Sequence, residues 1–166
     1  MQLKRNKQFL LKVCLNKYIV LLLCLLFSNF SFAADLKKTQ PDPSLDARDV
    51  VEIVMNAMGN NDYPYQNHGI EITYNFASPA NKMVTGPLSR FSEMIRVGIY
   101  ASMLNFKDVK YENYKVDGRN AQIDVILETK DNVTQGFQFR LKRQIDNEYH
   151  DSWMTDSVMP ISITKT

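Results

Sequence analysis

The sequence has few of the residues on which catalytic and metal-binding motifs depend. Its 166 residues include two cysteines, two histidines, one tryptophan and six glycines. It contains no HExxH, no G-x-S-x-G, no glycine-rich phosphate loop and no EF-hand loop. Both cysteines, Cys14 and Cys24, precede residue 34, so the rest of the chain has no thiol for redox chemistry, catalysis or metal binding. The sequence therefore indicates no cofactor and no enzyme class.

The start of the chain has the three parts of a secretory signal. Residues 1–17 carry five basic residues and no acid, and residues 18–27 (YIVLLLCLLF) form an apolar run. Ser31 and Ala33 supply the small residues of a cleavage site, so we expect cleavage after Ala33. Cleavage after Ala34 would place a bulky phenylalanine at the third position back. The alternative is an uncleaved anchor, although the run is shorter than the roughly 20 residues of a transmembrane helix.

The charge of the chain changes when this segment is removed. Residues 1–33 contain five of the 20 basic residues and none of the 18 acidic ones, so the remainder carries a net charge of −3. A weakly acidic chain lacks the basic footprint of a nucleic-acid-binding protein. We therefore expect a periplasmic or secreted protein that does not bind nucleic acid. It would contact a membrane only through an uncleaved signal.

Three regions follow from the sequence: a signal at 1–33, a flexible linker at 34–46 and a single domain at 47–166. The linker contains two prolines and has no apolar periodicity. Residues 47–58 have a broad apolar arc at helical spacing, with Ser44 or Asp46 as the cap and Gly59 as the stop.

Two further segments precede the predicted strands. Residues 69–77 (GIEITYNFA) alternate like a strand, but they also pair apolar residues at i,i+4 like a helix, and Ser78-Pro79 ends the segment either way. Gly86-Pro87 opens a second helix. The apolar residues on one face of that helix are Leu88, Phe91, Ile95 and Ile99.

The last third of the chain changes to a period of two residues. Four strands are predicted, near 109–116, 121–128, 137–142 and 150–163, with the last one bent or ended near Pro160. Asp-Gly and Asp-Asn pairs mark the turns between them. Helices followed by a meander predict an α+β fold, with N-terminal helices packed on a curved four-stranded antiparallel sheet.

Several short motifs resemble an uncharacterised family of unknown function in the cystatin-like, nuclear-transport-factor-2-like superfold. They are NDYP at 61–64, HGIE at 68–71, FASPxNK at 76–82 and TGPxxxF at 85–91, with Trp153 on the last strand. The resemblance covers about residues 47–160. It implies a cone-shaped α+β fold, often dimeric, with a pocket between helices and sheet, and it favours helix over strand for 69–77. The superfold includes isomerases, dehydratases and non-catalytic binding modules, so it decides no function.

Six residues are candidates for binding a ligand. Aromatic and ionisable side chains gather in the loop before residue 69, and such rings can line a binding site. Arg90 could hold an anion, although it lies off the apolar stripe and is expected to be exposed or paired with Glu93. The candidates are Asp62, Tyr63, Tyr65, His68, Arg90 and Trp153.

Other ionisable residues have weaker patterns. His68 near carboxylates could act as a general base. A surface histidine that is hydrogen-bonded in a turn is the favoured interpretation. Asp124 and Asp156 are out of phase with the apolar residues of their strands, so we expect both to face solvent. A zinc site from His68 and His150 with nearby acids is not expected, because no ligand spacing supports it.

Two functions remain open. The first is a non-catalytic binding module for an unknown protein partner, a second copy of the chain or a small amphipathic ligand. The second is a small acid–base enzyme, with His68 or Asp62 as the base. The first is favoured, because no ionisable residue is predicted to face inward on the meander and a catalytic pocket usually has one.

Overall fold

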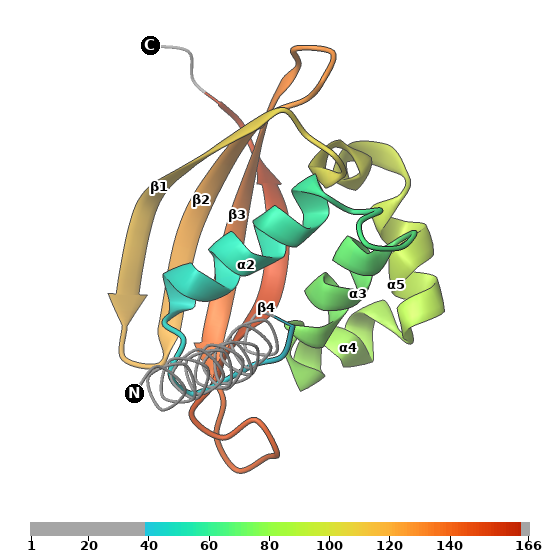
Figure 1. Ribbon diagram of the computed structural model, residues 1–166. Helices are drawn as coiled ribbons and strands as arrows, with labels where there is room; N and C mark the ends of the chain where they lie inside the picture. The colour runs from blue at the N-terminus through green and yellow to red at the C-terminus, as the bar shows by residue number, and fades with distance from the viewer. Residues whose placement is uncertain (1–38, 164–166) are drawn as a thin grey trace, which may run out of the picture. The chain divides into compact units, whose positions relative to one another are not determined.

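The computed structural model describes residues 39–163, which form helices followed by an antiparallel sheet (Figure 1). The helices are α2 (Ala47–Gly59), α3 (His68–Asn75), α4 (Pro79–Thr85), α5 (Leu88–Ile95) and the 3₁₀ helix η1 (Gly98–Met103). The strands are β1 (Asp108–Asp117), β2 (Asn120–Glu128), β3 (Thr134–Arg143) and β4 (Trp153–Ile161). The predicted α+β fold class is confirmed.

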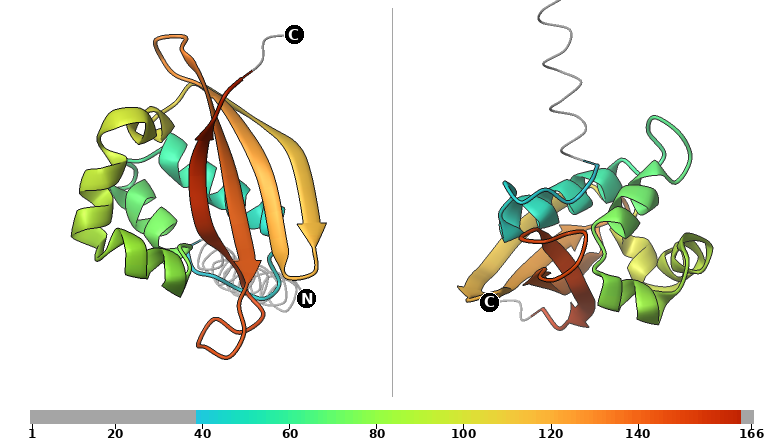
Figure 2. Two further views of the ribbon diagram at one scale, coloured as in Figure 1. Left: turned by 180° about the vertical axis from the view of Figure 1, so that it is seen from behind. Right: turned by 90° about the horizontal axis from the view of Figure 1, so that it is seen from below.

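The sheet is a meander in which each strand pairs with the next along the chain, in the order β1-β2-β3-β4. α2 lies across one face, while α3, α4 and α5 lie beside β4 (Figures 1 and 2). Seen from behind, the other face carries none of the described helices (Figure 2). Alternate residues point to the helix-covered face. Those of β2 and β3 form the core: Ala121, Ile123, Val125, Leu127, Phe137, Phe139 and Leu141.

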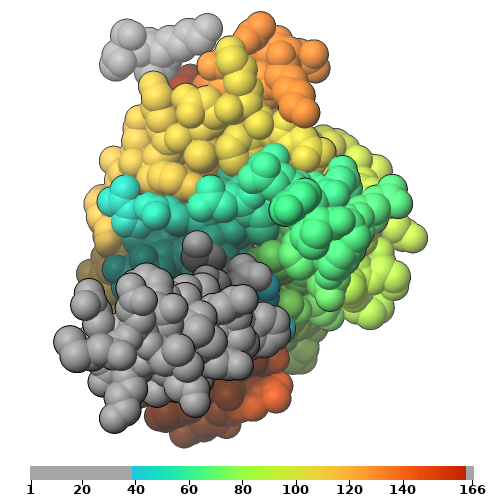
Figure 3. All heavy atoms as spheres, in the orientation of Figure 1, coloured from blue at the N-terminus to red at the C-terminus, as the bar shows by residue number. Residues whose placement is uncertain are grey.

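α2 begins at a capping box, as its sequence predicts. Asp46, rather than Ser44, is the cap: its carboxylate accepts a hydrogen bond from the backbone N–H of Asp49 at 2.8 Å. The Asp49 carboxylate accepts one from the N–H of Asp46 at 2.9 Å. In the space-filling view α2 lies between β1 (yellow) and α3 (green) (Figure 3). The buried residues of α2 are Ala47, Val50, Val51, Val54, Met55 and Met58.

The ambiguous segment 69–77 is mostly helical, because α3 occupies residues 68–75. α3 crosses α2 so closely that a Cβ atom on Gly69 would lie 2.1 Å from the carbonyl oxygen of Ala57. The N–H of Gly69 also donates to the carbonyl oxygen of Asn61 at 2.9 Å. Helix–helix packing at a glycine therefore overrides the strand-like alternation.

A short backbone bridge joins the helices to the free edge of β4. Directly after α3, Ala77 pairs in parallel with Thr155. The N–H of Thr155 donates to the carbonyl oxygen of Phe76, and the N–H of Ser78 donates to that of Thr155, both at 2.8 Å. This bridge, called the 77–155 bridge below, holds the start of α4 against β4.

α4 is a helix that the sequence patterns did not predict. Ser78-Pro79 ends the preceding segment as expected, but it also starts α4. Ser78 Oγ accepts from the N–H of Asn81 at 3.1 Å, and Pro79 occupies the first turn. Gly86 ends the helix with a φ of 81°. None of the residues of α4 is buried. Its sequence therefore has no stripe of apolar residues at helical spacing, which is the pattern that predicts a helix.

The second predicted helix is shorter than expected. α5 ends at Ile95, and the chain turns at Gly98, with a φ of 60°, into η1. Phe91 and Ile95 are buried as predicted, whereas Leu88 and Ile99 are exposed. The interruption at Gly98 moves Ile99 off the buried stripe, and Leu88 lies in the first turn, at the margin of the core.

Two β-bulges interrupt the sheet. In β1 the register shifts around Asn113, which has a φ of 52°. In β4 the residues Thr155 and Ser157 pair with consecutive residues of β3, which leaves Asp156 as the extra residue. A bulge breaks the alternation of side chains and turns the extra residue in a new direction.

Asp124 is nearly buried, so the expectation that it faces solvent is wrong. It lies on the helix-free face of β2, as the alternation predicts, but only 8% of its surface is exposed. Asn113 Nδ2 donates to its Oδ2 at 2.8 Å, and Gln138 Nε2 donates to its Oδ1 at 3.1 Å. These neighbours on β1 and β3 cover the carboxylate, which thereby connects three strands.

Some predictions concern residues outside the described range of 39–163. These are the signal at 1–33, the cleavage sites at Ala33 and Ala34 and the first part of the predicted linker. Within residues 39–163, no helix is long and apolar enough to span a bilayer. β4 continues past Pro160, which an edge strand tolerates because its free side needs no N–H donor.

Replacing Gly69 with alanine is expected to lower the free energy of unfolding by about 3 kcal/mol, because the new Cβ forces α2 and α3 apart. The control is Gly118→Ala in the β1–β2 turn, where a Cβ meets nothing within 4 Å and only the φ of 56° is unfavourable. That change should cost about 1 kcal/mol. Urea unfolding followed by circular dichroism measures both, and equal losses would contradict the close helix crossing.

Candidate functional site

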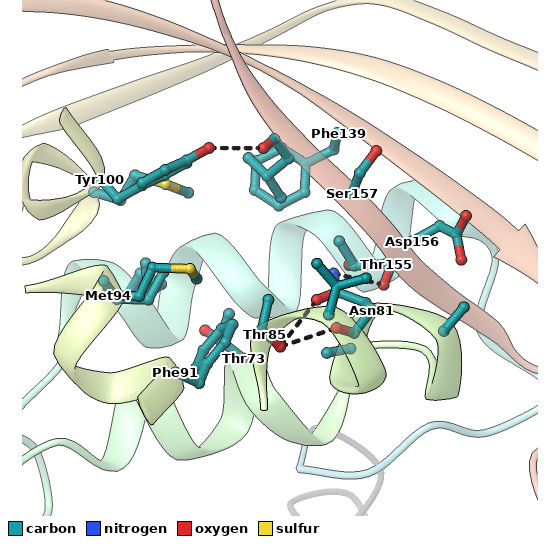
Figure 4. Close-up of a pocket in the computed structure, with 17 residues that line it drawn as sticks. Thr73, Asn81, Thr85, Phe91, Met94, Tyr100, Phe139, Thr155, Asp156 and Ser157 are labelled. Carbon is teal, nitrogen blue, oxygen red and sulfur yellow. Dashed lines mark hydrogen bonds between the residues drawn. The ribbon is translucent and has the colours of Figure 1, made fainter. Parts of the chain in front are cut away.

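A pocket of about 440 Å³ lies between the helices and the edge strand β4 (Figure 4). Small-molecule sites commonly measure roughly 300–1,000 Å³, so the size is suitable for a ligand. The helices that contribute most are α4, α5 and η1. The lining residues are Met58, Thr73, Ala77, Ala80, Asn81, Val84, Thr85, Phe91, Met94, Ile95, Tyr100, Met103, Phe139, Thr155, Asp156, Ser157 and Val158.

The part of the pocket formed by α5 and η1 is apolar. Phe91, Met94, Ile95 and Met103 line it. Figure 4 shows Phe91 and Met94 together, with Tyr100 on the same side of the pocket. Methionine side chains are flexible and polarisable, so they adapt to the shape of an apolar ligand. This end is suited to the hydrocarbon part of a small molecule.

Polar side chains gather where α4 meets β4. Figure 4 shows Asn81, Thr85, Thr155, Asp156 and Ser157 on this side. Thr85 Oγ1 donates to the carbonyl oxygen of Asn81 at 3.0 Å, and Asn81 Nδ2 donates to that of Thr155 at 3.3 Å. Together with the 77–155 bridge, these bonds fix α4 against β4 and hold the polar end in place.

Thr155 has a buried hydroxyl without a partner. Only 6% of the residue is exposed, and its Oγ1 has no hydrogen-bond partner within residues 39–163. An unpaired buried polar group costs about 1–3 kcal/mol. Thr155 lines the pocket, but this oxygen is itself enclosed by the protein.

Asp156 also lines the pocket, so it is less exposed than the alternation of the strand predicts. The residue is half-buried, and Ser78 Oγ donates to its Oδ1 at 2.8 Å. The bulge in β4 is the physical reason: as the extra residue, Asp156 does not follow the alternation from which its direction was predicted.

Tyr100 holds η1 against the edge of β4. Its hydroxyl donates to the carbonyl oxygen of Val158 at 3.1 Å, and its ring stacks on that of Phe137 with 6.0 Å between centroids. Edge strands carry backbone groups that no neighbouring strand pairs. Tyr100 therefore satisfies one such carbonyl and closes one side of the pocket.

The six predicted ligand residues do not line this pocket. Four of them lie together in the loop after α2 and at the start of α3: Asp62, Tyr63, Tyr65 and His68. Arg90 is exposed on α5, and Trp153 belongs to the hydrophobic core. The structure thus brings the loop residues together but separates them from the pocket, and their role in binding stays a prediction.

Asn61 organises the loop, although it was not among the predicted site residues. Its Oδ1 accepts from the N–H of Ile70 at 3.1 Å, and its Nδ2 donates to Asp62 Oδ1 at 2.9 Å. The same Asp62 oxygen accepts from the N–H of Asn67 at 3.0 Å. Asp62, predicted as a ligand or base, is thus occupied by bonds within the loop. The sequence signals for Asn61 are its place directly after a helix stop and its position as the first residue of the NDYP motif at 61–64.

The rings of the loop differ in exposure. Tyr63 is 80% exposed and Tyr65 is 50% exposed. The Tyr65 hydroxyl donates to Glu71 Oε2 at 2.7 Å, and this bond raises the pKa of Tyr65 above its ordinary value. The His68 ring lies 4.5 Å from the Tyr65 ring, and its buried Nδ1 has no partner in the described chain.

Metal ligands do not cluster in the part of the chain that the structure describes. No three histidine, cysteine, aspartate or glutamate side chains there come together around a common point. His150 Nε2 lies 3.9 Å from Asp151 Oδ2, and both side chains are largely exposed.

Comparison with known protein families assigns the domain. The family model described as "Domain of unknown function (DUF4864)" matches residues 41–164. The chain belongs to this family. No curated protein matches it. The DUF4864 domain contains every described helix and strand. It therefore includes the described pocket and the loop at residues 60–67 between α2 and α3, called the aromatic loop below.

Asn61→Ala is expected to lower the free energy of unfolding of the DUF4864 domain by about 2 kcal/mol, because the N–H of Ile70 would stay buried and unpaired. Hydrogen exchange in residues 62–68 should also become faster. Gln66→Ala, an exposed position in the same loop, is the control. It should change the free energy of unfolding by no more than about 0.5 kcal/mol and leave the hydrogen exchange of the loop unaltered. Unaltered exchange in the Asn61 variant would show that another group holds the loop.

Proposed function

We propose that this DUF4864 protein is an exported, non-catalytic binding module whose pocket holds a small amphipathic ligand. The observation that carries the proposal is the division of the pocket into an apolar end at α5 and η1 and a hydrogen-bonding end at α4 and β4. A molecule with an apolar body and a polar head matches this division.

The energetics of such a site support the proposal. Burial of apolar ligand surface contributes about 25 cal/mol per Å², and a few placed polar groups then orient the ligand. Apolar burial would supply most of the affinity, and the polar end would supply the selectivity.

Acid–base catalysis is the alternative function, and one observation favours it. Asp156 lines the pocket, and a carboxylate there is a usable general base for an isomerase- or dehydratase-like reaction. The two bases predicted from the sequence, His68 and Asp62, are not among the lining residues. The Tyr100 hydroxyl already donates to a backbone carbonyl. The lining therefore offers Asp156 as a base but no second group placed to act as an acid, so we favour binding over catalysis.

We also place the domain in the cystatin-like, nuclear-transport-factor-2-like superfold. The order of helices and meander, the position of α2 across one sheet face and the pocket between helices and sheet all support this placement. The superfold does not choose between binding and catalysis, because it includes proteins of both kinds.

A pocket-filling variant tests the binding proposal. Ala80→Trp places a large ring on the α4 side of the pocket and should weaken the binding of 1-decanol by about tenfold or more, since the ring occupies the ligand's space. Met83→Trp is the matched control: Met83 lies on the same helix, is exposed and does not line the pocket. Isothermal titration calorimetry measures both variants.

Equal weakening in the two tryptophan variants would place 1-decanol elsewhere on the surface. Absence of any decanol binding to the unmodified protein would refute the amphipathic pocket. Native mass spectrometry of the same samples counts the chains per particle, and it therefore also tests the dimer that the family resemblance implies and any partner protein that stays attached.

Export has its own test. Expressed with its natural N-terminus in a Gram-negative bacterium, the protein should reach the periplasm. Its intact mass there should be that of a chain starting at Ala34. Ala33→Tyr should block this processing, because the cleavage site requires a small residue there. A membrane fraction that retains the full mass of the unmodified chain would support the uncleaved anchor instead.

A further inference from the structure

The described lining of the pocket contains a negative charge and no positive one. Asp156 is the only charged side chain among the lining residues. No lysine, arginine or histidine nitrogen within residues 39–163 lies within ion-pair distance of its carboxylate. Within residues 39–163, its carboxylate accepts one hydrogen bond, from Ser78 Oγ to Oδ1, and Oδ2 accepts none. The charge at the polar end of the pocket is therefore uncompensated.

Cations on the other face of the sheet do not supply the missing charge. A second, shallower hollow lies there, and it also reaches Asp156. Lys115, Arg140 and Lys142 line this hollow, and all three are exposed. Arg140 Nε donates to Gln138 Oε1 at 3.1 Å, and none of the three forms an ion pair with Asp156. Asp156 therefore stays open to a partner from the pocket.

A neighbour of Asp156 in the pocket, Asn81, offers a further hydrogen-bond acceptor. Its Oδ1 lies 3.4 Å from Thr85 Oγ1, whose proton the carbonyl oxygen of Asn81 accepts at 3.0 Å. An ammonium group has three N–H donors and no acceptor. The carboxylate of Asp156 and the amide oxygen of Asn81 can accept from those donors, whereas an anionic head would meet the charge of Asp156 with no ion-paired cation to offset it.

We infer that the pocket selects a hydrophobic amine, an alkyl- or arylalkylammonium ion whose head pairs with Asp156 and whose body lies against Phe91, Met94 and Met103. This inference rests on the proposed function and specifies its ligand class. Ser78 has a positioning role, because its hydroxyl fixes one carboxylate oxygen and leaves the other free. The bulge in β4 is what places this carboxylate in the lining.

Three probes of equal chain length test the inference: decylamine, 1-decanol and decanoate. Each is titrated by calorimetry into the chain as purified from cells, in a buffer without amines. Decylamine should bind about tenfold more tightly than either of the others, because only it forms a charge-assisted hydrogen bond with Asp156. This preference should shrink at high ionic strength, since salt screens a half-buried ion pair in part.

Asp156→Asn is the informative variant, because asparagine keeps the size of the side chain and can still accept the Ser78 bond. It should remove the preference for decylamine and leave the affinity for 1-decanol nearly unchanged. Asp131→Asn, an exposed carboxylate in the β2–β3 turn, is the matched control and should keep the full preference. Circular dichroism confirms that both variants are folded, and the salt dependence of the unmodified protein provides a readout that needs no variant.

The outcomes separate the two proposals. Equal binding of all three probes, or tighter binding of decanoate, would overturn the amine inference and leave the amphipathic pocket standing. Loss of the decylamine preference in the Asp131 control would also overturn it, because the effect would then reflect net charge. Failure of all three probes to bind would refute the proposed function together with the inference.

Discussion

The site depends on one pair of backbone hydrogen bonds, those of the 77–155 bridge. The bridge attaches the end of α3 and the start of α4 to the edge of β4, two parts of the chain that are far apart in sequence. Through it, Ser78 reaches the carboxylate of Asp156 and Asn81 reaches the backbone of Thr155. Without this attachment α4 would lose its backbone link to β4, and the polar end of the pocket would lose the contacts that position it.

The elements that the sequence predicts well are those with a strong local pattern. α2 has a wide apolar arc and a capping box, and the strands alternate between apolar and polar residues with clear turns between them. The membership of a family of unknown function was predictable from short motifs, and the match over residues 41–164 confirms it. In each case, residues within about one turn or one hairpin contain the information.

The candidate site could not be predicted in the same way, because long-range contacts create it. α4 has no buried stripe, so only its contact with β4 reveals its importance. Asp156 reaches the pocket through a bulge, which no alternation pattern announces. The sequence instead pointed to the aromatic loop, where Asp62 serves bonds within the loop. The aromatic and ionisable residues of that loop suggested ligand binding, but the contacts that form the pocket lie between the helices and β4.

The two edges of the sheet have a consequence for how molecules of this protein can associate. Edge strands offer free backbone groups to other chains and so promote aggregation. On β4, the 77–155 bridge, the bulge, Pro160 and the Tyr100 hydroxyl interrupt that row of groups. On β1, a bulge and five exposed charged side chains do the same: Asp108, Lys110, Glu112, Lys115 and Asp117. Strand-to-strand growth into fibrils is therefore opposed at both edges of the sheet.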